Sequence, residues 1–192
     1  MDNVLTIAEE RLNLFAHMAN SACGLSLWCF GMKKQLYTCT CPAEKEFRLF
    51  LDLGQCLDYA IAHGPESHAP ILMSDPIGML WVAECVWHGD DASYLVILGP
   101  VFDAAASWQT LQNCLRGMNL SVSLTATIME KLEQVPILPL STLHQYIKML
   151  HWVLYEETLD VGSIRLQNRS NIIPDKEKSP YHRDPDTARS LG

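Results

Sequence analysis

Residues 79–102 contain two apolar runs, MLWVAECVWH and YLVILGPVF, that are separated by a short acidic turn. Each run is long enough for a β-strand, and a short turn joins neighbouring antiparallel strands. Neither run alternates cleanly with polar residues, so the sheet that contains them has to be covered on both faces. Because side chains alternate along a strand, one face of the first strand would be wholly apolar. Its members are Ile77, Met79, Trp81, Ala83, Cys85 and Trp87.

Two helices and three short strands are expected before this pair of strands, and three helices after it. Helical spacing of apolar residues predicts the helices, and runs of β-forming residues between turn residues predict the strands. This order indicates an α+β fold with an antiparallel sheet of about five strands, flanked by helices and followed by C-terminal helices. The helices are expected at 4–23, 43–64, 107–118, 123–135 and 140–159, and the other strands at 25–30, 35–40 and 69–75.

The chain of 192 residues has the length of one domain with a tail. Residues 1–166 are expected to form the domain, and residues 167–192, which are polar and interrupted by prolines, a linker or a disordered end. Residues 1–164 hold 8 Lys and Arg against 18 Asp and Glu, whereas the remainder holds 6 against 4. The excess of acidic residues in 1–164 would repel the phosphates of a nucleic acid, which argues against a nucleic-acid-binding surface in this part of the chain.

The cysteines and the first residues indicate a cytoplasmic protein. Seven cysteines are an odd number, and most lie inside apolar runs, so reduced thiols are expected instead of disulfides. The first 20 residues carry Glu9, Glu10 and Arg11 in an amphipathic pattern, unlike a signal peptide. No apolar run has the length that spans a bilayer.

Residues with catalytic or metal-binding chemistry are few. The chain contains no glycine-rich nucleotide motif and no G-x-S-x-G, so an enzyme is disfavoured and no cofactor is predicted. Cys39 and Cys41 could bind a metal only with help from His63 and His68, and two strand-end cysteines are the simpler interpretation. The helical histidines His144 and His151 are seven positions apart, not the four of common metal sites.

Aromatic and sulfur-containing residues are dense around the predicted sheet, and they would suit a partly apolar small-molecule pocket. Glu84 is the one carboxylate inside an apolar strand, so it could meet a polar group of a ligand. Plain core packing explains most of these residues equally well, and Glu84 could instead pair with a neighbouring Lys or Arg. The candidate ligand-binding residues are Trp28, Tyr37, Met73, Met79, Trp81, Glu84, Cys85 and Tyr94.

The last predicted helix carries a broad apolar stripe. Its spacings of four, three and four residues are those of a coiled-coil seam. One side of this helix could cover the sheet while the other meets a second copy of the chain, which predicts a homodimer. The candidate interface residues are Leu143, Ile147, Leu150 and Leu154.

Four segments together resemble the amino-terminal region of AraC-type transcriptional regulators from Gram-positive bacteria. They are FRLFLDLGQCLDYAIAHG, APILMSDPIGMLWVAE, YLVILGPVF and VPILPLSTLHQYIKMLHWVLYEETL. The resemblance implies a region that senses a small-molecule effector and dimerises, placed before two DNA-binding helix-turn-helix motifs that this chain would lack. The order of elements also resembles PAS and GAF sensor folds, in which ligands bind between the sheet and a flanking helix.

Two other functions remain open at the level of the sequence. One is a free-standing enzyme that uses a buried Cys or His, with Cys56 and Cys85 as the cysteines to test. The other is a dimerisation module that binds no ligand.

Overall fold

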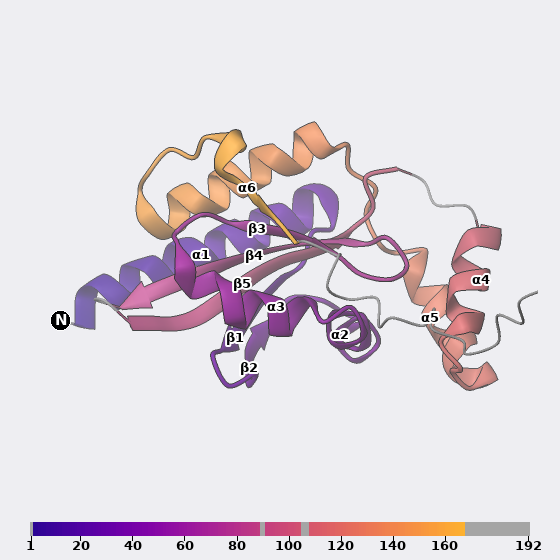
Figure 1. Cartoon of the computed structure of the whole chain (residues 1–192). Coiled ribbons are helices and arrows are strands. Elements are labelled where there is room, and N and C mark those ends of the chain that lie inside the picture. Colours follow the sequence, from indigo (N-terminus) through magenta and orange to yellow (C-terminus); the bar gives the residue numbers. More distant parts are fainter. Residues whose placement is uncertain (1, 89–90, 105–107, 168–192) are drawn as a thin grey trace, which may run out of the picture.

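The computed structural model describes residues 2–88, 91–104 and 108–167 and has the α+β architecture that the sequence predicts (Figure 1). The predicted linker therefore lies almost wholly outside the described residues. The helices are α1 (Asp2–Cys23), α2 (Glu44–Leu53), α3 (Cys56–His63), α4 (Trp108–Gly117), α5 (Val122–Leu132) and α6 (Leu140–Tyr155), with 3-10 turns at Gly64–Glu66 and Val161–Ser163. The strands are β1 (Leu27–Gly31), β2 (Leu36–Cys39), β3 (Ile71–Ser74), β4 (Leu80–His88), β5 (Asp91–Val101) and β6 (Arg165–Leu166).

The sheet has six strands in the order β2-β1-β5-β4-β3-β6. All neighbours are antiparallel except β6, which pairs in parallel with β3. The sheet is therefore mixed, with one strand more than the sequence predicts, because a strand of two residues is too short to leave a periodic pattern. The predicted neighbours β3, β4 and β5 are adjacent, and Trp81 at their centre is fully buried.

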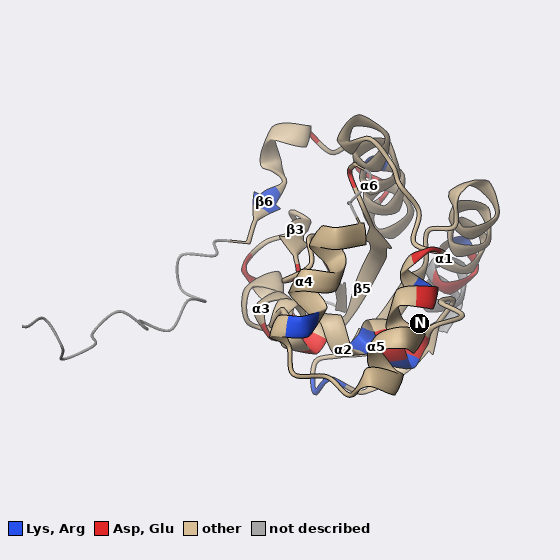
Figure 2. Cartoon of the chain, turned by 90° about the vertical axis from the view of Figure 1, so that its right-hand side faces the viewer, with Lys and Arg blue, Asp and Glu red and all other residues tan. Residues whose placement is uncertain are grey.

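Helices cover both faces of the sheet, as the two apolar runs require (Figures 1 and 2). Helices α2 and α3 lie on one face, and the α4–α5 pair lies at one end of the molecule. Helices α1 and α6 lie side by side on the opposite face. The odd-numbered positions of β4 from Trp81 to Cys85 face α2 and α3, and Leu80, Val82 and Val86 belong to the core cluster under α1 and α6.

The segment expected as a single helix at 43–64 forms two helices. Helix α2 ends at Leu53, where Gly54 follows, and Gln55 adopts a left-handed conformation with φ 52° before α3 begins. Gly54 is also tightly placed, because a Cβ atom there would lie 3.1 Å from Asp75 Cα. The break thus lets the second helix change direction next to the loop that follows β3.

Candidate functional site

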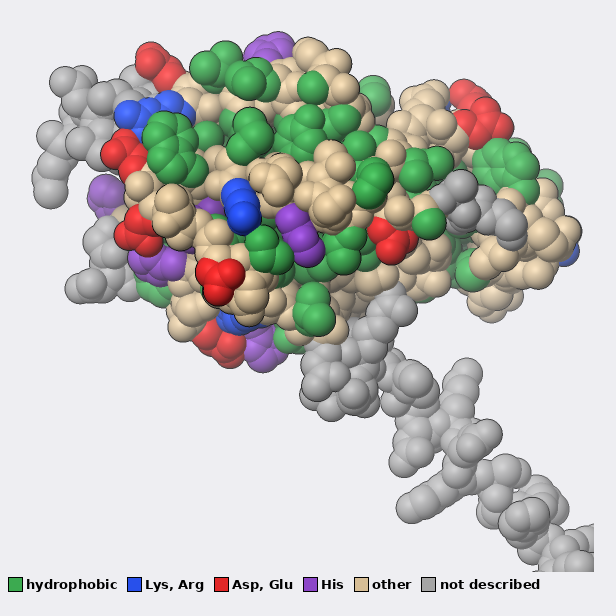
Figure 3. Space-filling view, turned by 90° about the horizontal axis from the view of Figure 1, so that it is seen from above, with side chains coloured by type: hydrophobic (Ala, Val, Ile, Leu, Met, Phe, Trp, Pro, Cys, Tyr) green, Lys and Arg blue, Asp and Glu red, His purple; other side chains and the backbone are tan. Residues whose placement is uncertain are grey.

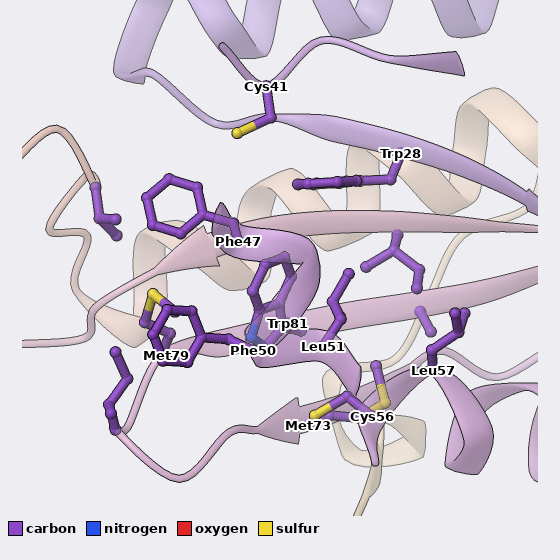
Figure 4. Close-up of a cluster of buried hydrophobic side chains, with 14 of the residues drawn as sticks. Trp28, Cys41, Phe47, Phe50, Leu51, Cys56, Leu57, Met73, Met79 and Trp81 are labelled. Atoms are coloured by element: carbon purple, nitrogen blue, oxygen red, sulfur yellow. The ribbon is translucent and has the colours of Figure 1, made fainter. Parts of the chain in front are cut away.

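Four predicted ligand-binding residues come together between the sheet and α2. Trp28, Met73, Met79 and Trp81 are fully buried in one cluster with side chains from α2 and α3 (Figure 4). The rings of Trp28 and Trp81 meet edge to face, with centroids 6.0 Å apart. Their indole nitrogens are satisfied, since Trp28 donates to the Gly99 carbonyl at 2.8 Å and Trp81 donates to Asp75 at 3.0 Å.

The other four predicted residues are dispersed. Cys85 faces the same layer and is buried, and burial raises the pKa of its thiol to about 11. Tyr37 lies on the outer strand β2 with 60% of its surface exposed, so it does not border this layer. Glu84 and Tyr94 point to the opposite face of the sheet, toward α1 and α6. The predicted set thus divides between the two faces.

Asp75 is a polar residue of this layer that sequence analysis placed only at the end of the strand expected at 69–75. Its side chain is fully buried and accepts hydrogen bonds from the backbone of Ile77 and Met79 and from the Trp81 indole, each at 3.0 Å. Burial raises the pKa of this carboxyl to about 7, although the hydrogen bonds oppose the shift. Asp75 fixes the turn between β3 and β4 and the indole of Trp81 at once.

On the opposite face, a buried polar pair joins β4 to α6. Glu84 and His151 are 1% and 4% exposed, and a carboxylate oxygen of Glu84 contacts Nδ1 of His151. Burial raises the pKa of Glu84, and the hydrogen bond with His151 opposes this shift. Its second oxygen, Oε2, has no hydrogen-bond partner among the described residues. His151 is therefore a buried partner of the sheet.

Tyr155 adds a second polar contact at the end of the same helix. Its hydroxyl donates to the carbonyl of Cys85 on β4, and burial raises the pKa of that hydroxyl. The ring of His68 stacks on Tyr155 with centroids 4.9 Å apart, and it lies 5.4 Å from the ring of Trp87. Helix α6 is thus held to β4 through specific polar and aromatic contacts as well as apolar packing.

The residues proposed for the dimer interface point inward. Leu143, Ile147 and Leu150 have no exposed surface and pack in the core cluster under α6, and Leu154 is only partly exposed. Side chains that already cover the sheet cannot contact a second copy while the helix stays in place. The apolar stripe is therefore the inner face of α6, which corrects the assignment of these residues.

The outer faces of α1 and α6 carry a different apolar surface, which we call the α1–α6 groove. Four large side chains line it and remain exposed: Leu14 (62%), Met18 (51%), Met149 (41%) and Trp152 (52%). The other lining residues are Arg11, Phe15, Gln145, Lys148 and Val153, so no carboxylate of the described residues lines the groove, although the exposed Glu156 pairs with Arg11 beside it. Seen from the side of α6, hydrophobic side chains outnumber charged ones on the surface (Figure 3).

The described part of the chain offers neither a metal site nor a membrane-spanning helix. Among residues 2–88, 91–104 and 108–167, no three His, Cys, Asp or Glu side chains come together as a metal ion would require. His63 instead contacts Glu66 at 2.8 Å, and His68 stacks on Tyr155. None of the helices in these ranges is both long enough and apolar enough to cross a membrane.

Comparison with known proteins adds no relative: no family model, no curated protein and no solved structure matches the chain.

Proposed function

We propose that the chain is a regulatory domain of an AraC-like transcription factor, which binds a small molecule and forms a homodimer through the α1–α6 groove. DNA binding would be carried by a part of the regulator outside this chain. The observation that carries the proposal is the position of α6. Its outer face is part of an exposed apolar groove, and its inner face is hydrogen-bonded to the centre of the sheet.

The size and charge of the groove favour a second copy of the same chain as its partner. Its four exposed side chains present on the order of 400 Å² of surface. A specific interface buries ~1,000 Å² or more in total, so the flanking polar residues of both copies would contribute the rest. The protein has a net charge of -8, so most pairings of two copies bring acidic surfaces together. The groove limits this repulsion, because none of its described lining residues is acidic and the neighbouring Glu156 is paired with Arg11.

The buried pair of Glu84 and His151 would connect the sheet to the dimer. If α6 can pack on the sheet in two arrangements, its outer face lies differently in each. A change in the sheet that favours one arrangement would then alter the dimer interface. Apolar contacts slide easily, whereas a hydrogen bond between two buried side chains fixes one register. We therefore propose that this pair couples the binding of an effector, in the layer between the sheet and α2, to the dimer interface.

The layer between the sheet and helix α2 is the proposed effector site. Met73 and Met79 are flexible thioethers that can repack around an apolar ligand, and the carboxylate of Asp75 offers a polar contact. These side chains suit a small, partly apolar effector, which would bind by displacing part of this fully buried layer. An effector that binds only the folded protein raises its melting temperature as its concentration increases.

Light scattering at micromolar concentration tests the dimer. We expect the wild type to have the mass of two chains and the double variant Met18→Glu, Trp152→Glu to be a folded monomer, because four charges would meet in the dimer's apolar contact. The control is Val122→Glu on α5, which adds a charge at a residue 88% exposed and away from the groove. A monomeric wild type, or a double variant that remains dimeric, would contradict the proposal.

A thermal-shift screen with small metabolites tests the effector. We expect at least one compound to raise the melting temperature of the wild type in a concentration-dependent way, and Met79→Trp, which overfills the layer, to abolish the shift. The Met18→Glu, Trp152→Glu variant should keep the shift, because the groove lies on the other face. If no compound shifts the wild type, the dimer alone would stand and the chain would be a dimerisation module without a ligand.

A further inference from the structure

A second hollow of the surface lies between helices α4 and α5, at the end of the molecule that faces the viewer in Figure 2. We call it the α4–α5 pocket. Its volume of about 620 Å³ is within the range of small-molecule sites in proteins. None of its lining residues belongs to the proposed effector layer or to the α1–α6 groove, so it is a separate candidate site.

The α5 side of the pocket is an apolar wall. Val122, Ala126 and Met129 follow the spacing i, i+4 and i+7, which places them on one side of the helix. Met129, together with Leu120 in the connection between the helices, packs against the core cluster that contains Trp81, so the interior supports this part of the wall. Val122 is 88% exposed, which is the largest exposed fraction among the large apolar side chains of the described residues. The wall therefore presents apolar surface to solvent.

The α4 side of the pocket supplies most of its polar groups. Arg116 lies one helical turn after Gln112, and Asn119 follows in the connection, where it adopts a left-handed conformation with φ 53°. Thr125 adds a hydroxyl from α5, although this hydroxyl already donates to the carbonyl of Ser121 at 3.0 Å. The pocket thus combines one guanidinium with two side-chain amides, which are groups that bind carboxylates and the amides of a ligand.

The charges around the pocket favour an anion. Arg116 is the only charged residue of the lining, and it forms no ion pair with another described residue. Residues 108–135 hold Arg116 and Lys131 against Glu130 and Glu133, so the acidic excess of the chain lies outside these two helices. Neither glutamate lines the pocket, and Glu130 pairs with Lys131 at 3.1 Å. A bound anion therefore meets one unpaired cation and no carboxylate among the described lining residues.

We propose that the α4–α5 pocket binds a small amphiphilic carboxylate that also carries amide groups. The carboxylate pairs with Arg116, the amide groups bond to Gln112 and Asn119, and the apolar part of the ligand covers the wall that includes Val122 and Met129. A guanidinium recognises a carboxylate through two parallel hydrogen bonds, whereas a neutral carboxamide lacks both the second acceptor oxygen and the charge. The inference is independent of the regulatory function proposed above, because it uses neither the effector layer nor the α1–α6 groove.

An NMR titration of the full chain with a matched pair of probes tests the proposal. N-acetyl-leucyl-phenylalanine has a free carboxylate, and its carboxamide has the same apolar side chains and amides without that charge. We expect saturable chemical-shift changes at the backbone amides of Leu120, Val122 and Met129, and an affinity about five-fold higher for the acid, as an exposed ion pair of good geometry provides. This comparison uses the wild type alone, so it does not depend on the folding of a variant. No saturable change at these amides, or equal affinities for the two probes, would overturn the assignment.

Substitutions on the two sides of the pocket give a second test. Arg116→Gln should weaken the binding of the acid about five-fold and leave that of the carboxamide unchanged, and Arg116→Lys should recover part of the difference. Val122→Glu adds a carboxylate to the apolar wall and should weaken the acid more than the carboxamide. The control is Lys131→Gln, which removes a cation of α5 that does not line the pocket and should change neither affinity. An Arg116→Gln variant that still prefers the acid would show that the carboxylate binds elsewhere and would refute the site.

Discussion

At Asp75, burial and hydrogen bonding act in opposite directions on one carboxyl group. Three N–H groups stabilise its ionised form, yet removal from water outweighs them and raises its pKa to about 7. A carboxyl with a raised pKa binds protons more tightly in the folded protein than in the unfolded chain. Its contribution to stability is therefore complete in acid, below its unfolded pKa near 4, and is lost as the pH rises through 7.

The substitution Asp75→Asn tests this sign. Between about pH 4 and pH 7, the wild type should lose up to about 1.4 kcal/mol of stability per pH unit relative to the variant. The amide side chain of the variant does not titrate, and it replaces one acceptor by a donor, so the variant is less stable overall. Urea unfolding across this pH range measures the difference in slope. Parallel pH profiles for the two proteins would show that Asp75 does not titrate as its burial implies.

At the scale of elements, helix α6 is joined to the sheet by side-chain hydrogen bonds of His151 and Tyr155 to β4. Its inner stripe of Leu143, Ile147 and Leu150 supplies apolar burial, and His151 supplies a contact with one carboxylate of β4. Removing one partner of a buried polar pair leaves the other buried without a hydrogen-bond partner, which is destabilising. Replacing both partners with apolar residues leaves no unpaired polar group and avoids that cost. The effects of substituting Glu84 and His151 on the free energy of unfolding are thus expected to be strongly non-additive.

We expect His151→Ala to cost about 3 to 5 kcal/mol, because Glu84 would remain buried without its partner. The double variant Glu84→Leu, His151→Leu should recover most of that loss. Chemical unfolding of the wild type, the single variants and the double variant gives the coupling energy directly. Lys148→Ala serves as the control on the groove side of the same helix, where we expect a change below about 0.5 kcal/mol. Additive effects at the two sites would contradict the assigned pairing.

The sequence predicted local features well and long-range ones poorly, and these elements show why. Alternation along β4 placed Trp81 and Cys85 on one covered face, because side-chain period is a property of the strand alone. The stripe on α6 was also real, but periodicity marks a buried face without saying what covers it. Tyr37 was misplaced for the same reason, since its strand turned out to be the outer one.

Two features of the site had no local signal at all. Glu84 and His151 are 67 positions apart, and only the packing of α6 on β4 brings them together. The α1–α6 groove needs the adjacency of two helices from opposite ends of the domain.

In the molecule as a whole, β6 ties the end of the described chain to the edge of the sheet. The backbone N–H of Arg165 donates to Pro70, and that of Gln167 donates to Leu72. The guanidinium of Arg165 also donates to the carbonyls of His63 at 2.7 Å and Ala69 at 2.9 Å. One side chain therefore holds the strand, the end of α3 and the segment before β3 together.

Arg165→Ala should lower the global stability by about 1.5 to 3 kcal/mol, since several charge-assisted hydrogen bonds to part-buried carbonyls are lost. The amides of Ile71 and Leu72 should exchange with solvent faster than those of β1, because the loosened edge opens first. Hydrogen exchange followed by mass spectrometry resolves both regions. The control Arg48→Ala removes an arginine of similar exposure from α2, with 24% of its side chain exposed against 27% for Arg165, and should leave β3 unchanged. Equal protection of β3 in wild type and Arg165→Ala would exclude this role.

The pairing of β6 with β3 also determines how late in synthesis on the ribosome the edge of the sheet is completed. Arg165 and Ala69 are 96 positions apart, so the edge of the sheet stays open while half of the 192-residue chain is being translated. During that interval the unpaired backbone of β3 can join a strand from another nascent chain. The two-residue strand that arrives last would end this vulnerable period, and a stalled ribosome would prolong it.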